Sequence, residues 1–149
     1  RRLLGVAIVL VAAGQLGDWG LGAAGRALAI SSHWTEWFDR DLVWGAWPVV
    51  LVTLVDTVVL APVFEELVFR GLLFGTLRRR LGPAAAALVS AAVFALAHGY
   101  GVIGFAAVFW SGLLWAWAYE RTGSLAPSIA AHAVDNLSAS LEVILVLRA

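Results

Sequence analysis

Long apolar stretches separated by short polar breaks run through the chain, and they predict helices that cross a membrane. Such a helix needs about 20 mostly apolar residues, because each residue adds about 1.5 Å along the axis. The expected spans are about 3–16, 44–60 leading into 62–77, 84–98, 102–119 and 125–147. The predicted fold class is therefore all-α, a multi-spanning transmembrane helical bundle forming one membrane-embedded domain over residues 1–149.

The apolar run over residues 42–77 is too long for one straight crossing of a bilayer. Pro48 and Pro62 can kink or break a helix, so one kinked helix and two helical pieces both remain open. The pair Gly82-Pro83 predicts the start of the next helix, because proline is favoured in a first helical turn.

The N-terminal run predicts a membrane helix rather than a secretory signal peptide, because no small-residue cleavage site follows it. Residues 17–41 are polar and glycine-rich and include Trp19, Trp34 and Trp37. Tryptophan collects at the headgroup level, so this segment predicts a water-exposed loop or an interface helix. The chain contains no Met and so does not begin at a natural start codon, and we expect a truncated N-terminus.

Three consecutive arginines at 78–80 predict a cytoplasmic connection by the positive-inside rule. Arg121 lies two crossings later and is expected on the same side. All ten basic residues are Arg, in a chain rich in Ala, Leu and Gly, which indicates a GC-rich bacterial genome. We therefore expect an integral protein of the bacterial plasma membrane.

Composition supports a membrane protein and excludes several kinds of chemistry. The residues are 62% hydrophobic and 13% charged, with a mean hydropathy of +0.89. Ten Arg balance ten acids, so no net field favours nucleic acid as a partner. The chain has no Cys, which excludes disulfides, thiolate metal sites and a cysteine nucleophile.

Several polar residues lie inside the apolar runs, where an ionisable side chain costs about 3 kcal/mol on insertion scales. Polar groups from separate membrane helices usually meet at a shared interior site, paired with one another. We expect such a site here. The residues concerned are Glu65, Glu66, Arg70, His98, His132, Asp135 and Asn136, with Asp56 and Glu142 as further outliers.

Helical spacing separates the roles of the two adjacent carboxylates. Glu66 and Arg70 are i,i+4 neighbours on one face and predict an ion pair. Glu65 lies about 100° round the helix, so we do not expect both carboxylates to point at one partner. A carboxylate beside one that is already neutralised is a candidate general base.

The two membrane-embedded histidines have their own helical partners. His132 and Asn136 are i,i+4, and Phe94 precedes His98 by one turn. Either histidine alone is more commonly a hydrogen-bonded structural residue than a catalyst. Two of them, together with a double glutamate on a third segment, favour a catalytic interpretation.

Three motifs in these helices resemble those of a known family. Residues 61–71, APVFEELVFRG, match E-E-x-x-x-R; residues 94–98, FALAH, match F-x-x-x-H; and residues 132–136, HAVDN, match H-x-x-x-N. In this order they resemble the CAAX-protease and bacteriocin-processing (CPBP, or Abi) family of intramembrane proteases. The motif-bearing core covers about residues 42–147.

The resemblance implies an endopeptidase that hydrolyses membrane-associated peptides of CAAX-like or bacteriocin type with a glutamate-activated water. Glu65 is then the base, and His98 helps to hold the water. His132 and Asn136 donate hydrogen bonds to the oxyanion, while Glu66 and Arg70 orient these groups.

Metal dependence stays open at this stage. The chain lacks H-E-x-x-H, but Glu65, His98 and His132 provide a His₂Glu set of the catalytic zinc type. We favour a metal-free mechanism without a cofactor and keep Zn²⁺ as the alternative. Asp135, next to the last motif, either holds the tautomer of His132 or faces a polar cavity.

Two other functions remain as alternatives. One is a non-enzymatic bacteriocin-immunity or partner-binding membrane protein with a relict site. It fits poorly with a complete set of costly intramembrane polar groups. The other is a small transporter, which would favour polar groups spread through the membrane depth and repeated halves, and no such repeat is present.

The tryptophans at 110, 115 and 117 are expected to be packing residues and interface anchors.

Overall fold

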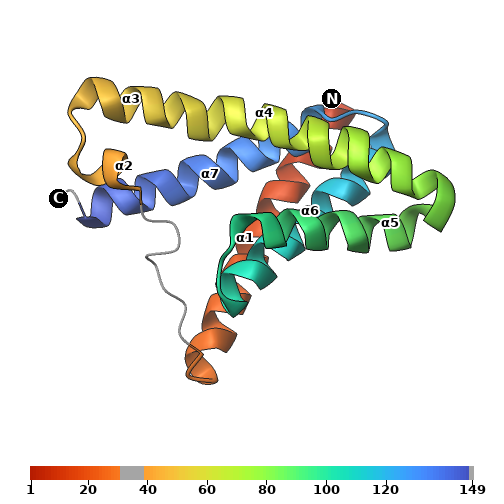
Figure 1. Cartoon of the computed structure of the whole chain (residues 1–149), viewed down its shortest axis with the longest axis horizontal. Coiled ribbons are helices and arrows are strands. Elements are labelled where there is room, and N and C mark those ends of the chain that lie inside the picture. Colours follow the sequence, from red (N-terminus) through yellow and green to blue (C-terminus); the bar gives the residue numbers. More distant parts are fainter. Residues whose placement is uncertain (31–38, 148–149) are drawn as a thin grey trace.

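The computed structural model describes residues 1–30 and 39–147, and every regular element in these ranges is a helix (Figure 1). This confirms the predicted all-α fold. Two of the elements, η2 and η3, are π-helical turns. In chain order the elements are α1 (Arg2–Ala27), α2 (Arg40–Trp44), α3 (Trp47–Val55), η2 (Asp56–Leu60), α4 (Ala61–Glu66), η3 (Leu67–Phe74), α5 (Gly75–His98), α6 (Val102–Thr122) and α7 (Ala126–Leu147).

Four helical stretches of the described chain are long and apolar enough to cross a membrane. They are Arg2–Ala27, Trp47–His98, Val102–Thr122 and Ala126–Leu147. Many large apolar side chains on their outer faces are exposed, including Leu51, Val52 and Leu72. Lipid tails accommodate such surfaces, whereas a soluble protein would have to cover them.

From Trp47 to Leu77 the apolar run is one continuous helix, in which Pro48 lies in the first turn and Pro62 causes no break. Residues 42–44 belong to the separate short helix α2. The elements α3, η2, α4, η3 and the start of α5 follow one another without a break. The chain reverses only at Gly82, whose φ of 78° lies in the left-handed region that glycine adopts freely. Pro83 then starts the returning part of α5, as predicted (Figure 1).

Helix α1 continues to Ala27, so the prediction that the first helix ends near residue 16 was wrong. Two of its glycines, Gly17 and Gly25, are packing positions against α6. The Trp110 indole occupies the place where a Cβ of Gly17 would lie, and a Cβ of Gly25 would lie 3.0 Å from Ile103 Cδ1. Small residues allow membrane helices to approach closely. Residues 31–38 of the predicted polar segment, which include Trp34 and Trp37, lie outside the described residues, and its last two residues begin α2.

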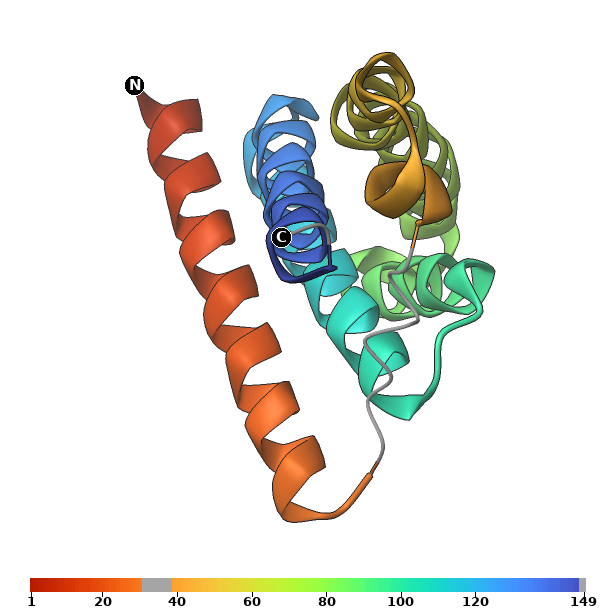
Figure 2. The same ribbon diagram turned by 90° about the vertical axis from the view of Figure 1, so that its left-hand side faces the viewer.

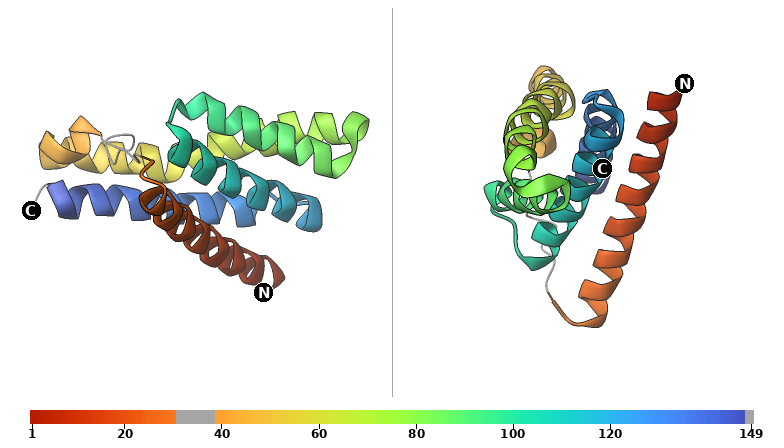
Figure 3. Two further views of the ribbon diagram at one scale, coloured as in Figure 1. Left: turned by 90° about the horizontal axis from the view of Figure 1, so that it is seen from below. Right: turned by 90° about the vertical axis from the view of Figure 1, so that its right-hand side faces the viewer.

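Helix α7 lies between α1 and the long helix that begins at Trp47, as Figures 2 and 3 show. Helices α5 and α6 complete the bundle beside them. One apolar cluster joins α1, α5, α6 and α7 at the centre, and another holds the α2–α3 corner against the end of α7. The buried members are Leu10, Phe94, Trp115, Ala118 and Ala131 in the first cluster, and Leu42, Val43, Val50 and Val143 in the second.

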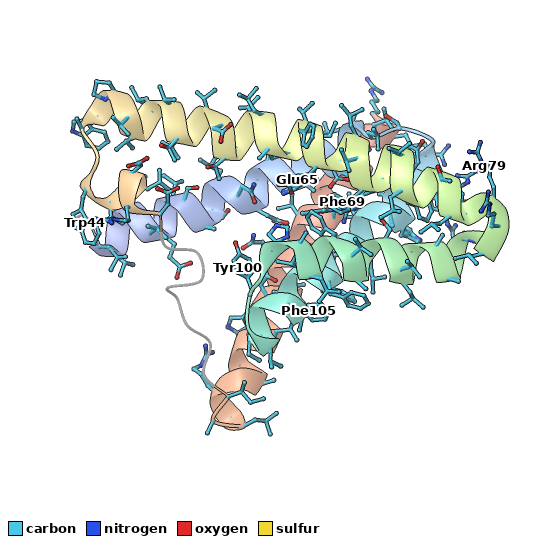
Figure 4. The ribbon with its side chains drawn as sticks, viewed as in Figure 1. Trp44, Glu65, Phe69, Arg79, Tyr100 and Phe105 are labelled. Carbon is cyan, nitrogen blue, oxygen red and sulfur yellow. The ribbon has the colours of Figure 1, made fainter. Side chains whose placement is uncertain are left out.

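The arginine-rich turn and the α6–α7 connection lie at the same end of the bundle. Arg78 Nη1 is 2.7 Å from Glu120 Oε2, and both side chains are partly exposed. This contact confirms the predicted same-side placement of Arg121 and the three arginines. In Figure 4, Arg79 marks this end of the long helix and Trp44 lies near the opposite end.

Candidate active site

The predicted ion pair between Glu66 and Arg70 is confirmed. Arg70 Nη1 donates to Glu66 Oε1 at 2.9 Å, and both side chains are 0% exposed. The two residues lie one turn apart on the long helix, across the boundary between α4 and η3. A buried charge is tolerated only when it is paired, so each residue depends on the other.

The remainder of the Arg70 guanidinium lies against aromatic rings. Its Cζ is 4.2 Å from the ring centre of Phe94 and 5.0 Å from that of Trp115. Among the described residues, Arg70 Nε and Nη2 have no hydrogen-bond partner, so these cation–π contacts take the place of hydrogen bonds. Gly112 makes room for the group, because a Cβ there would lie 3.0 Å from Arg70 Nη2.

His132 on α7 contacts both glutamates. Its Nδ1 lies 3.3 Å from Glu66 Oε1, and its Nε2 lies 3.7 Å from Glu65 Oε2. The expectation that the two carboxylates would not share a partner was therefore wrong. An imidazole carries a nitrogen on each of two edges, so one ring reaches carboxylates that point in different directions.

Aromatic residues fix the His132 ring, and sequence reasoning assigned one of them only a general packing role. Trp115 is 3% exposed and stacks on His132 with ring centres 4.2 Å apart and an interplanar angle of 20°. The Phe94 ring lies edge-on to both His132 and His98, at centroid distances of 5.9 and 4.6 Å. Phe94 belongs to the second motif, but no local pattern distinguishes Trp115 or Gly112.

His98 ends α5 and is oriented by its own helix. Its Nδ1 donates to the Phe94 carbonyl oxygen at 2.8 Å, a bond that fixes the Nδ1–H tautomer. In the neutral ring of this tautomer, Nε2 is the acceptor. Gly99 follows with a φ of 68° and turns the chain away, so that His98 stands at the end of the helix.

Asn136 lies one turn beyond His132 on α7 and contacts the long helix. Its Nδ2 donates to the Thr57 carbonyl oxygen of η2 at 2.8 Å. This bond uses one of the two hydrogens on the amide nitrogen.

A cavity of about 710 Å³ lies between α1, α5, α6 and α7. His98, His132 and Asn136 are among its lining residues, as are Asp18 and Glu142. Glu65 is not among the lining residues; it adjoins the site through His132, and its side chain is 28% exposed. In Figure 4, Glu65 lies on the side of the long helix that faces α7 and α5.

Asp135 faces this cavity rather than His132. Gln15 of α1 donates to Asp135 Oδ1 at 3.1 Å, and Glu66, not Asp135, is the carboxylate at His132 Nδ1. The cavity-facing alternative for Asp135 is therefore the observed one. A glycine at position 14 allows this approach, because its Cβ would lie 3.3 Å from Asp135 Oδ2.

The candidate zinc set does not form a ligand group in the described ranges. Over residues 1–30 and 39–147, no group of three or more His, Asp or Glu side chains is arranged to hold a metal ion. Glu65 and His132 approach each other, but His98 does not complete a set with them.

Comparison with known protein families identifies the family of this site. Residues 45–138 match the family described as type II CAAX prenyl endopeptidase Rce1-like. The chain belongs to this family. It is therefore an integral membrane protease of the general CAAX type. The match covers all six predicted site residues, whereas α1 lies outside it. No curated protein and no solved structure matches the chain.

Proposed function

We propose that the protein is an endopeptidase in which Glu65 activates a water molecule for attack on a peptide bond, without a metal ion. One observation carries this proposal. Within the described residues, Glu65 Oε2 is buried without a hydrogen-bond partner, 3.7 Å from His132 Nε2. Glu66 is already engaged by Arg70 and His132, so Glu65 is the carboxylate left to accept a proton.

In the proposed reaction, Glu65 takes a proton from the water as its oxygen bonds to the scissile carbonyl carbon. The Nε2 lone pair of His98 accepts a hydrogen bond from the other hydrogen of the water, which stays on the oxygen, and this bond orients the attack. The carbonyl oxygen becomes an oxyanion and accepts hydrogen bonds from His132 Nε2–H and from the second amide hydrogen of Asn136. The C–N bond then breaks, and Glu65 returns its proton to the leaving amine.

The proposed mechanism uses both edges of the His132 ring. Its Nδ1 lies 3.3 Å from Glu66 Oε1, and its Nε2, 3.7 Å from Glu65 Oε2, faces the proposed position of the oxyanion. Stacking on Trp115 holds the ring in this orientation.

The cavity indicates the kind of substrate. Its volume of about 710 Å³ is that of a typical ligand site, and its walls come from membrane helices. We propose that it admits a short stretch of a membrane-associated peptide, of CAAX-like or bacteriocin type. Under this proposal residues 1–149 act as one domain in a bacterial plasma membrane, and neither a cofactor nor nucleic acid takes part.

Glu65→Gln tests the proposal. Membrane-protein fragments from cells that express the native protein are compared with fragments from cells that express this variant. The native protein should generate fragments that Glu65→Gln does not, because the loss of a general base lowers the rate by about 10²–10⁴. Asp56→Asn is the matched control, since Asp56 is an exposed carboxylate on the same long helix.

Native fragments should persist with Asp56→Asn. Fragment patterns that are identical for the native protein and Glu65→Gln would contradict the proposal and favour a non-enzymatic function.

A further inference from the structure

Two π-helical turns flank the short helix that carries both glutamates. The turn η2 (Asp56–Leu60) precedes α4, and η3 (Leu67–Phe74) follows it. Each widened turn is met by a side chain from another helix. Asn136 of α7 donates to the Thr57 carbonyl oxygen at 2.8 Å, and Ser90 of α5 donates to the Phe69 carbonyl oxygen at 2.8 Å.

The Thr57 carbonyl lacks both of its regular helical partners. In an α-helix its donor is the N–H of Ala61, but that group donates to Asp56 instead. In a π-helix its donor is the residue five positions on, which is Pro62, and proline has no N–H. The missing bond is therefore a direct consequence of a proline placed just after a π turn.

Leaving this carbonyl unpaired would be costly. Pro62 is fully buried, and the surrounding segment lies in a membrane helix, where no bulk water reaches the backbone. A buried polar group without a hydrogen-bond partner destabilises the fold by the full free energy of its desolvation. The side-chain amide of Asn136, on a different helix, donates the hydrogen bond that this carbonyl would otherwise lack.

We propose that Asn136 is a positioning residue that replaces the hydrogen bond Pro62 cannot donate. The bond fixes the rotation of α4 relative to α7. Because His132 lies one turn before Asn136, and Glu65 and Glu66 lie shortly after Pro62, the same contact sets how the glutamates meet the imidazole. This role is additional to oxyanion donation, and only its effect on rate rests on the proposed function.

A double-mutant cycle between Asn136→Ala and Pro62→Ala tests the inference. Asn136→Ala alone should lower the thermal midpoint of the purified protein by about 4 °C or more, because it strands the carbonyl. In the Pro62→Ala background the chain regains an N–H that can donate to the Thr57 carbonyl. Asn136→Ala should then lower the thermal midpoint by less than about half as much as it does in the native background.

Pro127→Ala is the matched control for the loss of a proline. Pro127 is also fully buried, but it lies in the first turn of α7, where an N–H has no partner within the helix. In the Pro127→Ala background, Asn136→Ala should lower the thermal midpoint by as much as it does in the native background. If Asn136→Ala alone does not fold, recovery of folded protein with Pro62→Ala supports the inference, and no recovery overturns it.

Kinetics separate positioning from a merely structural role. Adding Pro62→Ala to Asn136→Ala should raise kcat by about three- to tenfold at unchanged KM, because the glutamates regain their orientation. The decrease in kcat that remains in the double variant reflects the missing oxyanion donor. Additive thermal midpoints would overturn the Pro62–Asn136 relation. Coupled midpoints with no gain in kcat would overturn the positioning role but leave the hydrolytic mechanism intact.

Discussion

Replacing Arg70 by leucine removes one half of a fully buried ion pair and leaves the other half charged. Glu66 would keep only the 3.3 Å contact from His132, and its Oε2 is already without a hydrogen-bond partner in the described structure. Breaking a buried pair in this way typically costs about 3–5 kcal/mol. For a chain of this size, each kcal/mol shifts the thermal midpoint by about 2–4 °C. Arg70→Leu should therefore melt roughly 6–20 °C lower in detergent.

Two further variants divide this loss into its causes. Arg70→Lys keeps the charge but loses the planar group that lies against Phe94 and Trp115, so its melting temperature should fall between those of native and Arg70→Leu. The double variant Glu66→Leu/Arg70→Leu has no stranded charge and should recover much of the stability, but not the activity.

The assay is thermal unfolding of the purified protein, followed by tryptophan fluorescence or circular dichroism. An Arg70→Leu protein that melts at the native temperature would refute the reasoning, and Arg70 would then be assigned to substrate contact. A double variant that is less stable than Arg70→Leu would show that the partners act independently.

Gly112→Ala should lower both stability and activity, since its Cβ would lie 3.0 Å from Arg70 Nη2 and from Ala91 Cβ. Overpacking of this kind typically costs about 1–3 kcal/mol of folding free energy. A native melting curve would show that α6 shifts to make room for the methyl group. Gly5→Ala on α1, with nothing within 4 Å of its Cβ, is the control. Chelation should leave peptide hydrolysis unchanged in the metal-free mechanism. Stoichiometric zinc in active protein, lost together with activity on chelation and restored by Zn²⁺, would assign Glu65 and the histidines to metal binding instead.

The features predicted correctly from sequence are those that depend on local periodicity. The apolar runs located the membrane helices because their length is set by the bilayer rather than by neighbours. The Glu66–Arg70 pair was predictable because residues four apart share a helical face in any context. The start of a helix at Gly82-Pro83 was predictable from local backbone preferences, since glycine adopts the left-handed conformation freely and proline is favoured in a first helical turn.

The features that were missed arise from contacts between helices. Trp115 and Gly112 acquire their roles only when α6 packs against the face of the long helix that carries Arg70. The glycines in the second half of α1 suggested a loop or an interface helix, because the sequence does not show that Trp110 and Ile103 of α6 fill the space beside Gly17 and Gly25. The sharing of His132 by two glutamates depends on the position of a third helix, which helical angles within one segment do not fix.

The cavity has one wall that the hydrolytic centre does not use. Gln15, Asp18 and Gly22 of α1 line it, whereas the residues proposed for the reaction all lie within the family-matched region 45–138. Under the proposed function, α1 thus contributes a substrate-contacting wall from outside the family-matched region. Substitutions at positions 15, 18 and 22 would then change peptide preference without replacing any residue proposed for the reaction, which makes α1 a starting point for engineering.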